Sequence, residues 1–158
     1  MALEETVAAL VGPARLQLKW PNDLLLDRAK VSGILLERAE DAVVIGVGVN
    51  LALHPALVER PTTSLAEHGA AITPADFAEQ LAALFAAWLF LWRRDGLAPI
   101  VARWTERAHP AGMQLVANLP DGEVVAGAFV RLAVDGALVL GLADGSERVI
   151  HAADVFPV

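Results

Sequence analysis

Apolar side chains recur at helical spacing in three parts of the chain. Residues 2–11 show this spacing, and Gly12-Pro13 ends the helix that they predict. A longer helix is expected from Thr73 as N-cap to Asp95, with a broad apolar stripe. The stripe predicts that its tryptophans, Trp88 and Trp92, pack in a core. Residues 97–108 predict a further short helix.

Between the first two helices the pattern changes to short apolar runs separated by turn residues. Residues 15–20, 24–26 and 31–37 are therefore expected to be strands, joined by polar turns. Residues 42–53 are apolar at nearly every position, which is typical of a central strand that is buried on both faces. The segment 54–69 is polar and irregular, so we expect a loop with one short helical turn.

Beyond residue 110 the spacing becomes that of antiparallel strands. Asp-Gly turns at residues 121–122, 135–136 and 144–145 separate short apolar runs, which is a strong hairpin signal. The change predicts an α+β protein with one domain over residues 1–109 and a small β-barrel domain over residues 110–158. The expected strands of the second domain are residues 113–118, 124–132, 137–142 and 147–151.

Composition narrows the class of protein. The 158 residues carry a net charge of −7, which argues against a general nucleic-acid binder because phosphates need a basic face. The absence of cysteine excludes disulfides and thiolate metal sites, and fits a cytoplasmic protein. The apolar stretch 81–92 is too short to span a bilayer. The histidines show no ligand spacing, so we expect all of them at the surface: His54, His68, His109 and His151.

Two lysines and a carboxylate form the best candidate for chemistry. Lys19 and Lys30 lie near the ends of consecutive predicted strands, with Asp23 between them. Lysine suits phosphate oxygens and developing negative charge, and aspartate can hold Mg²⁺, as adenylyl or phosphoryl transfer requires. By spacing alone, the same residues are more typical of a solvated surface, because Lys-x-x-x-Asp occurs by chance.

Two glycines give the apolar run 42–53 a flat face. Gly46 and Gly48 lie on the same side of the predicted strand, and Asn50 ends it. The missing side chains leave a floor for a planar ring or chain, although tight packing within a sheet would use them as well. The pair is not a dinucleotide fingerprint, because no third glycine and no helix follow it.

Taken together, these motifs resemble those of the biotin protein ligase family. Lys-Trp-Pro-Asn-Asp at residues 19–23, Lys-Val-Ser-Gly-Ile-Leu-Leu-Glu at residues 30–37 and Gly-Val-Gly-Val-Asn at residues 46–50 follow the family's order and distances. Pro-Thr-Thr-Ser-Leu at residues 61–65 also matches. The resemblance implies a mixed-sheet, class II synthetase-like catalytic domain followed by an SH3-like barrel.

The resemblance also implies an activity and a site. Such ligases condense biotin with ATP to biotinyl-5′-adenylate, and then transfer biotin to a lysine of a carrier domain such as that of acetyl-CoA carboxylase. Lys30 falls on the catalytic lysine, and Asp23 on the position that meets Mg²⁺. The other implied ATP contacts are Lys19, Asn22 and Asn50, and the implied biotin contacts are Gly33, Leu35, Gly46 and Val49.

The chain departs from the family pattern in one respect. The family's glycine- and arginine-rich loop, which closes over biotin and the adenylate, does not occur in it, and neither does a winged helix. We therefore expect a truncated ligase with impaired activity, no DNA partner and no membrane partner; a homodimer is left open. The alternatives are a non-catalytic remnant that serves as a binding module, and a lipoate-type ligase.

Overall fold

The computed structural model describes residues 1–56 and 60–158. By their contacts the residues form two compact units. The first comprises Met1–Leu18 and Asn22–Leu91, and the second comprises Lys19–Pro21 and Trp92–Val158. The predicted boundary at residues 109–110 lies inside the second unit.

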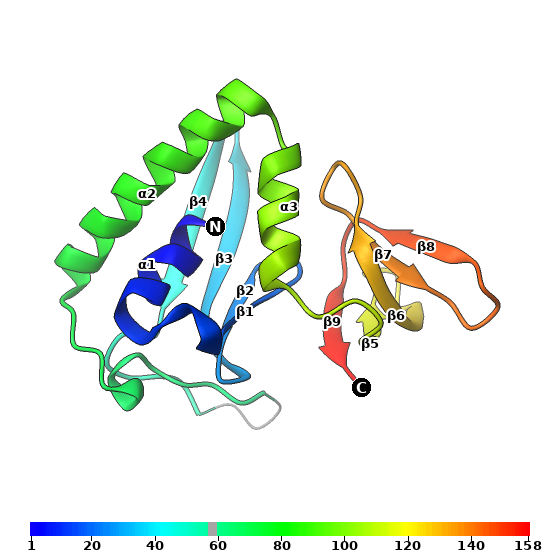
Figure 1. Ribbon diagram of the computed structural model, residues 1–158, viewed down its shortest axis with the longest axis horizontal. Coiled ribbons are helices and arrows are strands. Elements are labelled where there is room, and N and C mark those ends of the chain that lie inside the picture. Colours follow the sequence, from blue (N-terminus) through cyan, green and yellow to red (C-terminus); the bar gives the residue numbers. More distant parts are fainter. Residues whose placement is uncertain (57–59) are drawn as a thin grey trace. The chain divides into compact units, whose positions relative to one another are not determined.

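A four-stranded sheet and two long helices make up the first unit (Figure 1). The strands follow one another in the order β1-β2-β3-β4, and the β2–β3 and β3–β4 pairings are antiparallel. The fold is therefore α+β, as predicted. The elements are α1 (Ala2–Val11), β1 (Leu16–Lys19), β2 (Asp23–Leu26), β3 (Ala29–Ala39), β4 (Ala42–Val49) and α2 (Pro74–Asp95), with short 3-10 helices at Pro13–Arg15 and Ala66–His68.

The β2–β3 hairpin brings the predicted catalytic residues together. Its turn residues Asp27 and Arg28 have φ angles of 48° and 69°, the left-handed conformation that a two-residue hairpin turn requires. The register then pairs Asp23 with Gly33 and Leu25 with Lys30, with an irregularity between Leu24 and Leu25. The local geometry of the hairpin thus places Asp23 close to Lys30, although seven positions separate them in the sequence.

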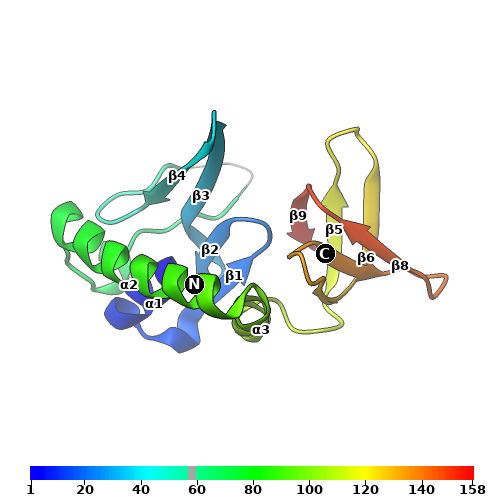
Figure 2. The ribbon, with the colours of Figure 1, turned by 90° about the horizontal axis from the view of Figure 1, so that it is seen from above.

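Both helices of the first unit lie on one face of the sheet (Figures 1 and 2). Thr73 caps α2 as predicted, because its Oγ1 accepts a hydrogen bond from the Asp76 amide at 3.2 Å. The helices and strands enclose a small apolar core that excludes water from the strand backbones. Its fully buried members include Val7, Leu24, Leu26, Val31 and Leu65.

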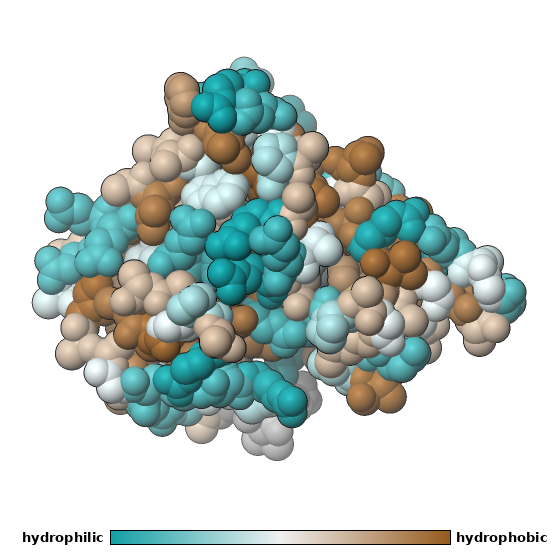
Figure 3. All heavy atoms as spheres, viewed as in Figure 1, coloured by the Kyte–Doolittle hydropathy of each residue, from teal (hydrophilic) through white to brown (hydrophobic). Residues whose placement is uncertain are grey.

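Two predictions about burial are wrong. β4 is exposed along most of its length, with Val43 62% and Val44 51% exposed, and it forms the edge of the sheet that the structure describes. Along α2 only Phe77 is buried, and Trp92 is 52% exposed. An apolar run in the sequence indicates that burial would be favourable, but burial also requires another element that packs against it. Apolar patches consequently reach the surface between polar ones (Figure 3).

Helix α2 also differs from the expectation about membranes. Over its 22 residues, Pro74–Asp95, it is long and apolar enough to cross a bilayer by length and composition alone. Within the first unit, the Trp88 indole N–H donates a hydrogen bond to Glu5 of α1 at 3.1 Å, and Phe77 is buried. These contacts attach α2 to the first unit.

The second unit is a five-stranded sheet with one helix. The strand order is β8-β7-β6-β5-β9, and every pairing in it is antiparallel. The described strands form an open sheet and no closed barrel, so the SH3-like assignment stays a prediction. Strand β9 was not predicted, because only its pairing with β5 makes it a strand. The elements are α3 (Ala98–Arg107), β5 (Gln114–Asn118), β6 (Val124–Leu132), β7 (Leu138–Gly141), β8 (Glu147–Ile150) and β9 (Asp154–Pro157).

Trp20, from the motif at residues 19–23, belongs to the core of the second unit. Its ring is 6% exposed, and its Nε1 donates a hydrogen bond to the carbonyl of Gly136 at 3.1 Å. Gly136 has a φ of 88° in one of the predicted Asp-Gly turns, where Asp135 Oδ1 accepts the Ala137 amide at 3.1 Å. The tryptophan of the motif therefore has a structural role.

His109 is buried, which contradicts the prediction that all four histidines lie at the surface. It is 3% exposed, and neither ring nitrogen has a hydrogen-bond partner among the described residues. Burial lowers the pKa of His109, and the positive charge of Lys19 lowers it further. The Lys19 ammonium, which lies 5.1 Å from the centre of the Phe156 ring, would repel a second positive charge at His109.

Acidification is expected to destabilise the second unit through His109. Because its pKa is lowered in the folded state, its stabilising contribution is present above the ordinary histidine pKa of about 6.5 and is lost as the pH falls through the folded-state pKa. Urea unfolding followed by tryptophan fluorescence, at several pH values from about 7.5 to about 5, measures this. The free energy of unfolding of the His109→Leu variant should depend less on pH than that of the wild type. The His151→Leu variant, changed at an exposed site, should keep the pH dependence of the wild type. Equal pH dependence in His109→Leu and the wild type would contradict the assignment.

Candidate functional site

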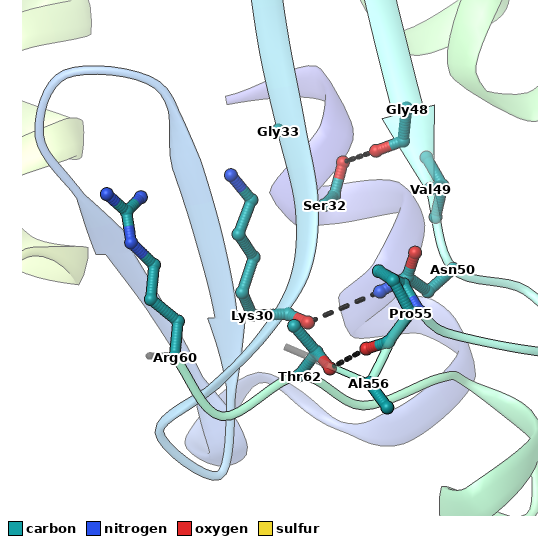
Figure 4. A pocket seen from close by; sticks show the side chains of 10 residues that line it. All are labelled: Lys30, Ser32, Gly33, Gly48, Val49, Asn50, Pro55, Ala56, Arg60 and Thr62. Carbon is teal, nitrogen blue, oxygen red and sulfur yellow. Dashed lines mark hydrogen bonds between the residues drawn. The ribbon is translucent and has the colours of Figure 1, made fainter. Parts of the chain in front are cut away.

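A cavity of 860 Å³ opens beside Lys30, a volume typical of small-molecule sites. One wall is the end of the β3–β4 pair, and the other is the segment that follows β4 (Figure 4). We call it the loop cavity. It is lined by Lys30, Ser32, Gly33, Gly48, Val49, Asn50, Pro55, Ala56, Arg60 and Thr62.

A second hollow of 480 Å³ runs along the β3–β4 face. Gly33, Gly46 and Gly48 leave it flat, because a Cβ at Gly46 or Gly48 would meet nothing closer than 3.8 Å. This is the floor that the sequence predicted. We call it the glycine trough. It is lined by Asn22, Lys30, Gly33, Ile34, Leu35, Gly46, Val47 and Gly48, so Lys30, Gly33 and Gly48 line both hollows.

The Lys30 ammonium is held by Asp23. Its Nζ lies 2.5 Å from Asp23 Oδ1, and the carboxylate is buried while the lysine side chain is 31% exposed. Gly33 makes this pair possible, because a Cβ there would lie 3.0 Å from Lys30 Nζ and 3.2 Å from Asp23 Oδ1. The predicted Lys30–Asp23 constellation is therefore brought together, with the cation directed over the glycine.

The backbone of Lys30 is held by the segment after β4. Its N–H donates to the Pro61 carbonyl at 2.9 Å, and its carbonyl accepts from the Thr63 amide at 3.1 Å. Asn50 supports this arrangement, because its side-chain amide donates to the carbonyls of Thr63 at 2.9 Å and Lys30 at 3.4 Å. Asn50 thus lines the loop cavity and also ties its two walls together.

Several predicted site residues do not line the loop cavity. Asn22 lines the trough, and its amide donates to the Ile34 carbonyl of β3 at 2.7 Å. Lys19 lines neither hollow, and its ammonium lies over Phe156 in the second unit. Of the predicted biotin contacts, Leu35 and Gly46 line only the trough, whereas Val49 lines only the loop cavity.

Sequence reasoning missed Ser32, Arg60 and Thr62. Arg60 and Thr62 lie in the polar segment that was interpreted only as a loop, and both line the cavity (Figure 4). Thr62 pairs with Lys30 in an isolated parallel β-bridge, and a single bridge leaves no periodic pattern in the sequence from which it could be predicted. Ser32 donates a hydrogen bond from its hydroxyl to the Gly48 carbonyl at 2.5 Å. An arginine just before the Pro-Thr-Thr-Ser-Leu motif was the one signal that could have indicated Arg60.

The residues that the structure describes contain no group of three or more acidic or histidine side chains placed to hold a metal ion. Asp23 is the carboxylate beside Lys30. A Mg²⁺ ion that is bound mainly through nucleotide phosphates needs only one or two protein carboxylates, so Asp23 has the right chemistry for such an ion.

Comparison with known proteins decides the family. Residues 11–50 match the model of the biotin/lipoate A/B protein ligase family. The chain is 39% identical to the biotin–[acetyl-CoA-carboxylase] ligase of Paracoccus denitrificans, over 99% of this chain and 69% of that protein. The chain belongs to the biotin–[acetyl-CoA-carboxylase] ligase family. The ligase of the same name from Mycobacterium tuberculosis is 34% identical over 98% of this chain, which spans 59% of its length.

Solved structures of biotin protein ligases share the fold. The apo enzyme of Aquifex aeolicus superposes with a TM-score of 0.84, at 18% identity, over 99% of this chain and 73% of that one. The structure of the same enzyme with biotin and ATP gives a TM-score of 0.83 at 19% identity, over 99% of this chain and 70% of that one. At this identity the likeness concerns the fold, and it agrees with the family assignment.

Replacing Gly33 by alanine is expected to displace the Lys30 ammonium without unfolding the ligase chain. The new Cβ would crowd the flexible end of a lysine, so the lysine can shift by a few tenths of an ångström. Crystal structures should show this shift in Gly33→Ala, and urea unfolding should change by less than about 1 kcal/mol. Gly46→Ala, where the nearest atom would lie 3.8 Å away, is the matched control. An unmoved Lys30 in Gly33→Ala would contradict the role given to Gly33.

Proposed function

We propose that the chain carries the adenylation chemistry of an ATP-dependent biotin–protein ligase. The position of Lys30 supports this most directly, since its side chain lines both the glycine trough and the loop cavity. A reaction that joins an apolar acid to a nucleotide needs one cation where the two substrates meet. The trough suits a planar ring with an apolar tail, and the more polar loop cavity suits the nucleotide.

The reaction follows from this placement. The biotin carboxylate attacks the α-phosphorus of ATP, a carbon–oxygen–phosphorus linkage forms, and the bond between the α-phosphorus and the bridging oxygen breaks to release pyrophosphate. The Lys30 ammonium stabilises the negative charge that develops on the α-phosphate oxygens. Asp23 fixes the ammonium through its 2.5 Å contact, so little reorganisation is needed during the reaction.

Other residues would hold the substrates in place. Mg²⁺, which neutralises phosphate charge when it accompanies ATP, would be held by Asp23 together with phosphate oxygens. Arg60 supplies a further cation to the lining of the loop cavity. Asn22 and Asn50 contribute by shaping the two hollows, because their side-chain amides donate to strand and loop carbonyls.

The second half-reaction is proposed from the family. A carrier-domain lysine would attack the carbonyl of biotinyl-5′-adenylate, forming an amide and releasing AMP. The ligases from Paracoccus and Mycobacterium are named for the acetyl-CoA carboxylase, which makes such a carrier the first to test. We also propose an SH3-like arrangement for the second unit, since its first strand, β5, pairs with its last, β9.

Loss of the Lys30 charge should abolish adenylate formation. With biotin and Mg-ATP, pyrophosphate release by Lys30→Ala is expected to fall at least about 10²-fold, as for removal of a group that stabilises transition-state charge. Lys30→Ala would leave the buried Asp23 carboxylate without its cation, which could destabilise the fold. Lys30→Gln is therefore the companion variant, because its amide can still donate to the carboxylate while the positive charge is lost. Pyrophosphate release that survives in both folded variants would refute the proposal.

Filling the glycine trough should impair biotin binding. Gly48→Val would place a branched side chain on the open floor. The KM for biotin should rise about tenfold or more, since the site would lose about 1.4 kcal/mol or more of binding free energy. Ala42→Val, on the same exposed strand but outside both hollows, is the control. Lipoate is assayed in parallel, because the matching family includes lipoate ligases. Pyrophosphate release with lipoate but not with biotin would favour the lipoate-type alternative.

A further inference from the structure

A continuous series of polar side-chain contacts connects the loop cavity to the turn of the β2–β3 hairpin. It begins at Thr62, which lines the cavity, and ends at Asp27 in the turn. None of its members carries a role in the proposed reaction. In order, the series runs through Thr62, His54, Glu67, Thr63, His68, Arg15 and Asp27.

Glu67 joins the two halves of this series. Its Oε2 accepts from the Thr63 hydroxyl at 2.7 Å, and its Oε1 lies 3.1 Å from His54 Nε2. The hydrogen bond from Thr63, followed by the one from His54, lowers the pKa of Glu67, so the side chain stays a carboxylate at neutral pH. A carboxylate has two acceptor oxygens: Oε1 faces His54, and Oε2 accepts from Thr63 and, at 3.4 Å, from the Ser64 amide.

The hydrogen-bond directions are consistent from Arg15 to Glu67. Arg15 can only donate, so His68 Nδ1, at 2.6 Å from Arg15 Nη2, accepts from it. His68 Nε2 then carries the proton and donates to the Thr63 hydroxyl oxygen at 2.8 Å. The Thr63 hydroxyl in turn donates to Glu67. Every donor thus meets an acceptor, and the carboxylate terminates this half of the series.

The other half ends at the cavity. The Thr62 hydroxyl donates its one proton to the Pro55 carbonyl at 2.5 Å, so at its 2.8 Å contact with His54 Nδ1 it can only accept. Thr63, held by Glu67, donates its backbone N–H to the carbonyl of Lys30. Glu67 therefore acts on both sides of the contact between this segment and the strand that carries Lys30.

We propose that Glu67 is a positioning residue, which through His54 and Thr63 holds the wall of the loop cavity in the geometry that binds ATP. The proposal rests on the proposed function, because it assigns the loop cavity to the nucleotide. Glu67 does not line the cavity and touches no reacting atom. The Lys30–Asp23 pair is made by other side chains, so it does not depend on Glu67.

The split between KM and kcat tests this role. A glutamine has one acceptor oxygen, so Glu67→Gln must give up acceptance either from His54 or from Thr63 and the Ser64 amide. We expect the KM for ATP to rise about tenfold, as for one lost hydrogen bond to a charged group, and kcat for pyrophosphate release to stay within about twofold. Glu79→Gln, which removes the same charge at an exposed site on α2, should leave both unchanged. A KM for ATP in Glu67→Gln equal to that in Glu79→Gln would overturn the proposal.

Variants at Thr63 identify the route. Thr63→Val keeps the shape of this buried side chain but removes its hydroxyl, and should raise the KM for ATP like Glu67→Gln, whereas Thr63→Ser should restore it. If both residues act through one bond, the double variant should be no worse than the worse single variant. Fully multiplicative effects, or failure of Thr63→Ser to restore the KM, would overturn the role of Thr63 in this route.

Amide hydrogen exchange separates this proposal from the proposed function. In Glu67→Gln the amides of Lys30 and Thr63 should exchange about tenfold faster, and the amides of the β5–β6 pairing should keep their rates. If the wild-type chain releases no pyrophosphate, the proposed function fails, and the exchange rates still decide whether Glu67 holds the segment. Unchanged exchange at Lys30 and Thr63 would refute the positioning role.

Discussion

The ion pair between Lys30 and the buried Asp23 is the interaction on which the site depends. A short hairpin turn sets its register, and Gly33 leaves the space in which the ammonium lies. A buried carboxylate requires a partner, so the pair fixes the lysine where the glycine trough and the loop cavity meet. The same lysine therefore borders both hollows while its own position stays fixed.

Around this pair, polar side chains serve mainly to hold backbone. Asn22 and Asn50 both donate from their amides to carbonyls of β3 or of the facing segment. Ser32 ties β3 to β4 in the same way. A substrate site that is open to water on one side gains its shape from such bonds, because the strands themselves have little apolar packing there. Residues that look like ligand contacts in a sequence can thus be part of the framework.

The motif at residues 19–23 illustrates the same point. Its first three residues belong to the second unit, where Trp20 fills the core and Lys19 lies over an aromatic ring. Its last two residues belong to the first unit, and Asp23 holds the ammonium of Lys30. Five consecutive residues therefore combine packing in one unit with chemistry in the other. A family motif, read as a whole, gives no indication of this division.

The sequence by itself determined what local interactions control. The helices α1 and α2, the hairpins and the Asp-Gly turns follow from spacing, capping and turn chemistry, and the pairing of Asp23 with Lys30 follows from one short turn. The tertiary structure decided what depends on partners distant in sequence. It exposed the apolar strand β4, buried His109, made a strand of residues 154–157 and placed Arg60 and Thr62 beside Lys30. Burial and cavity walls depend on which surfaces meet, and no periodicity along the chain encodes that.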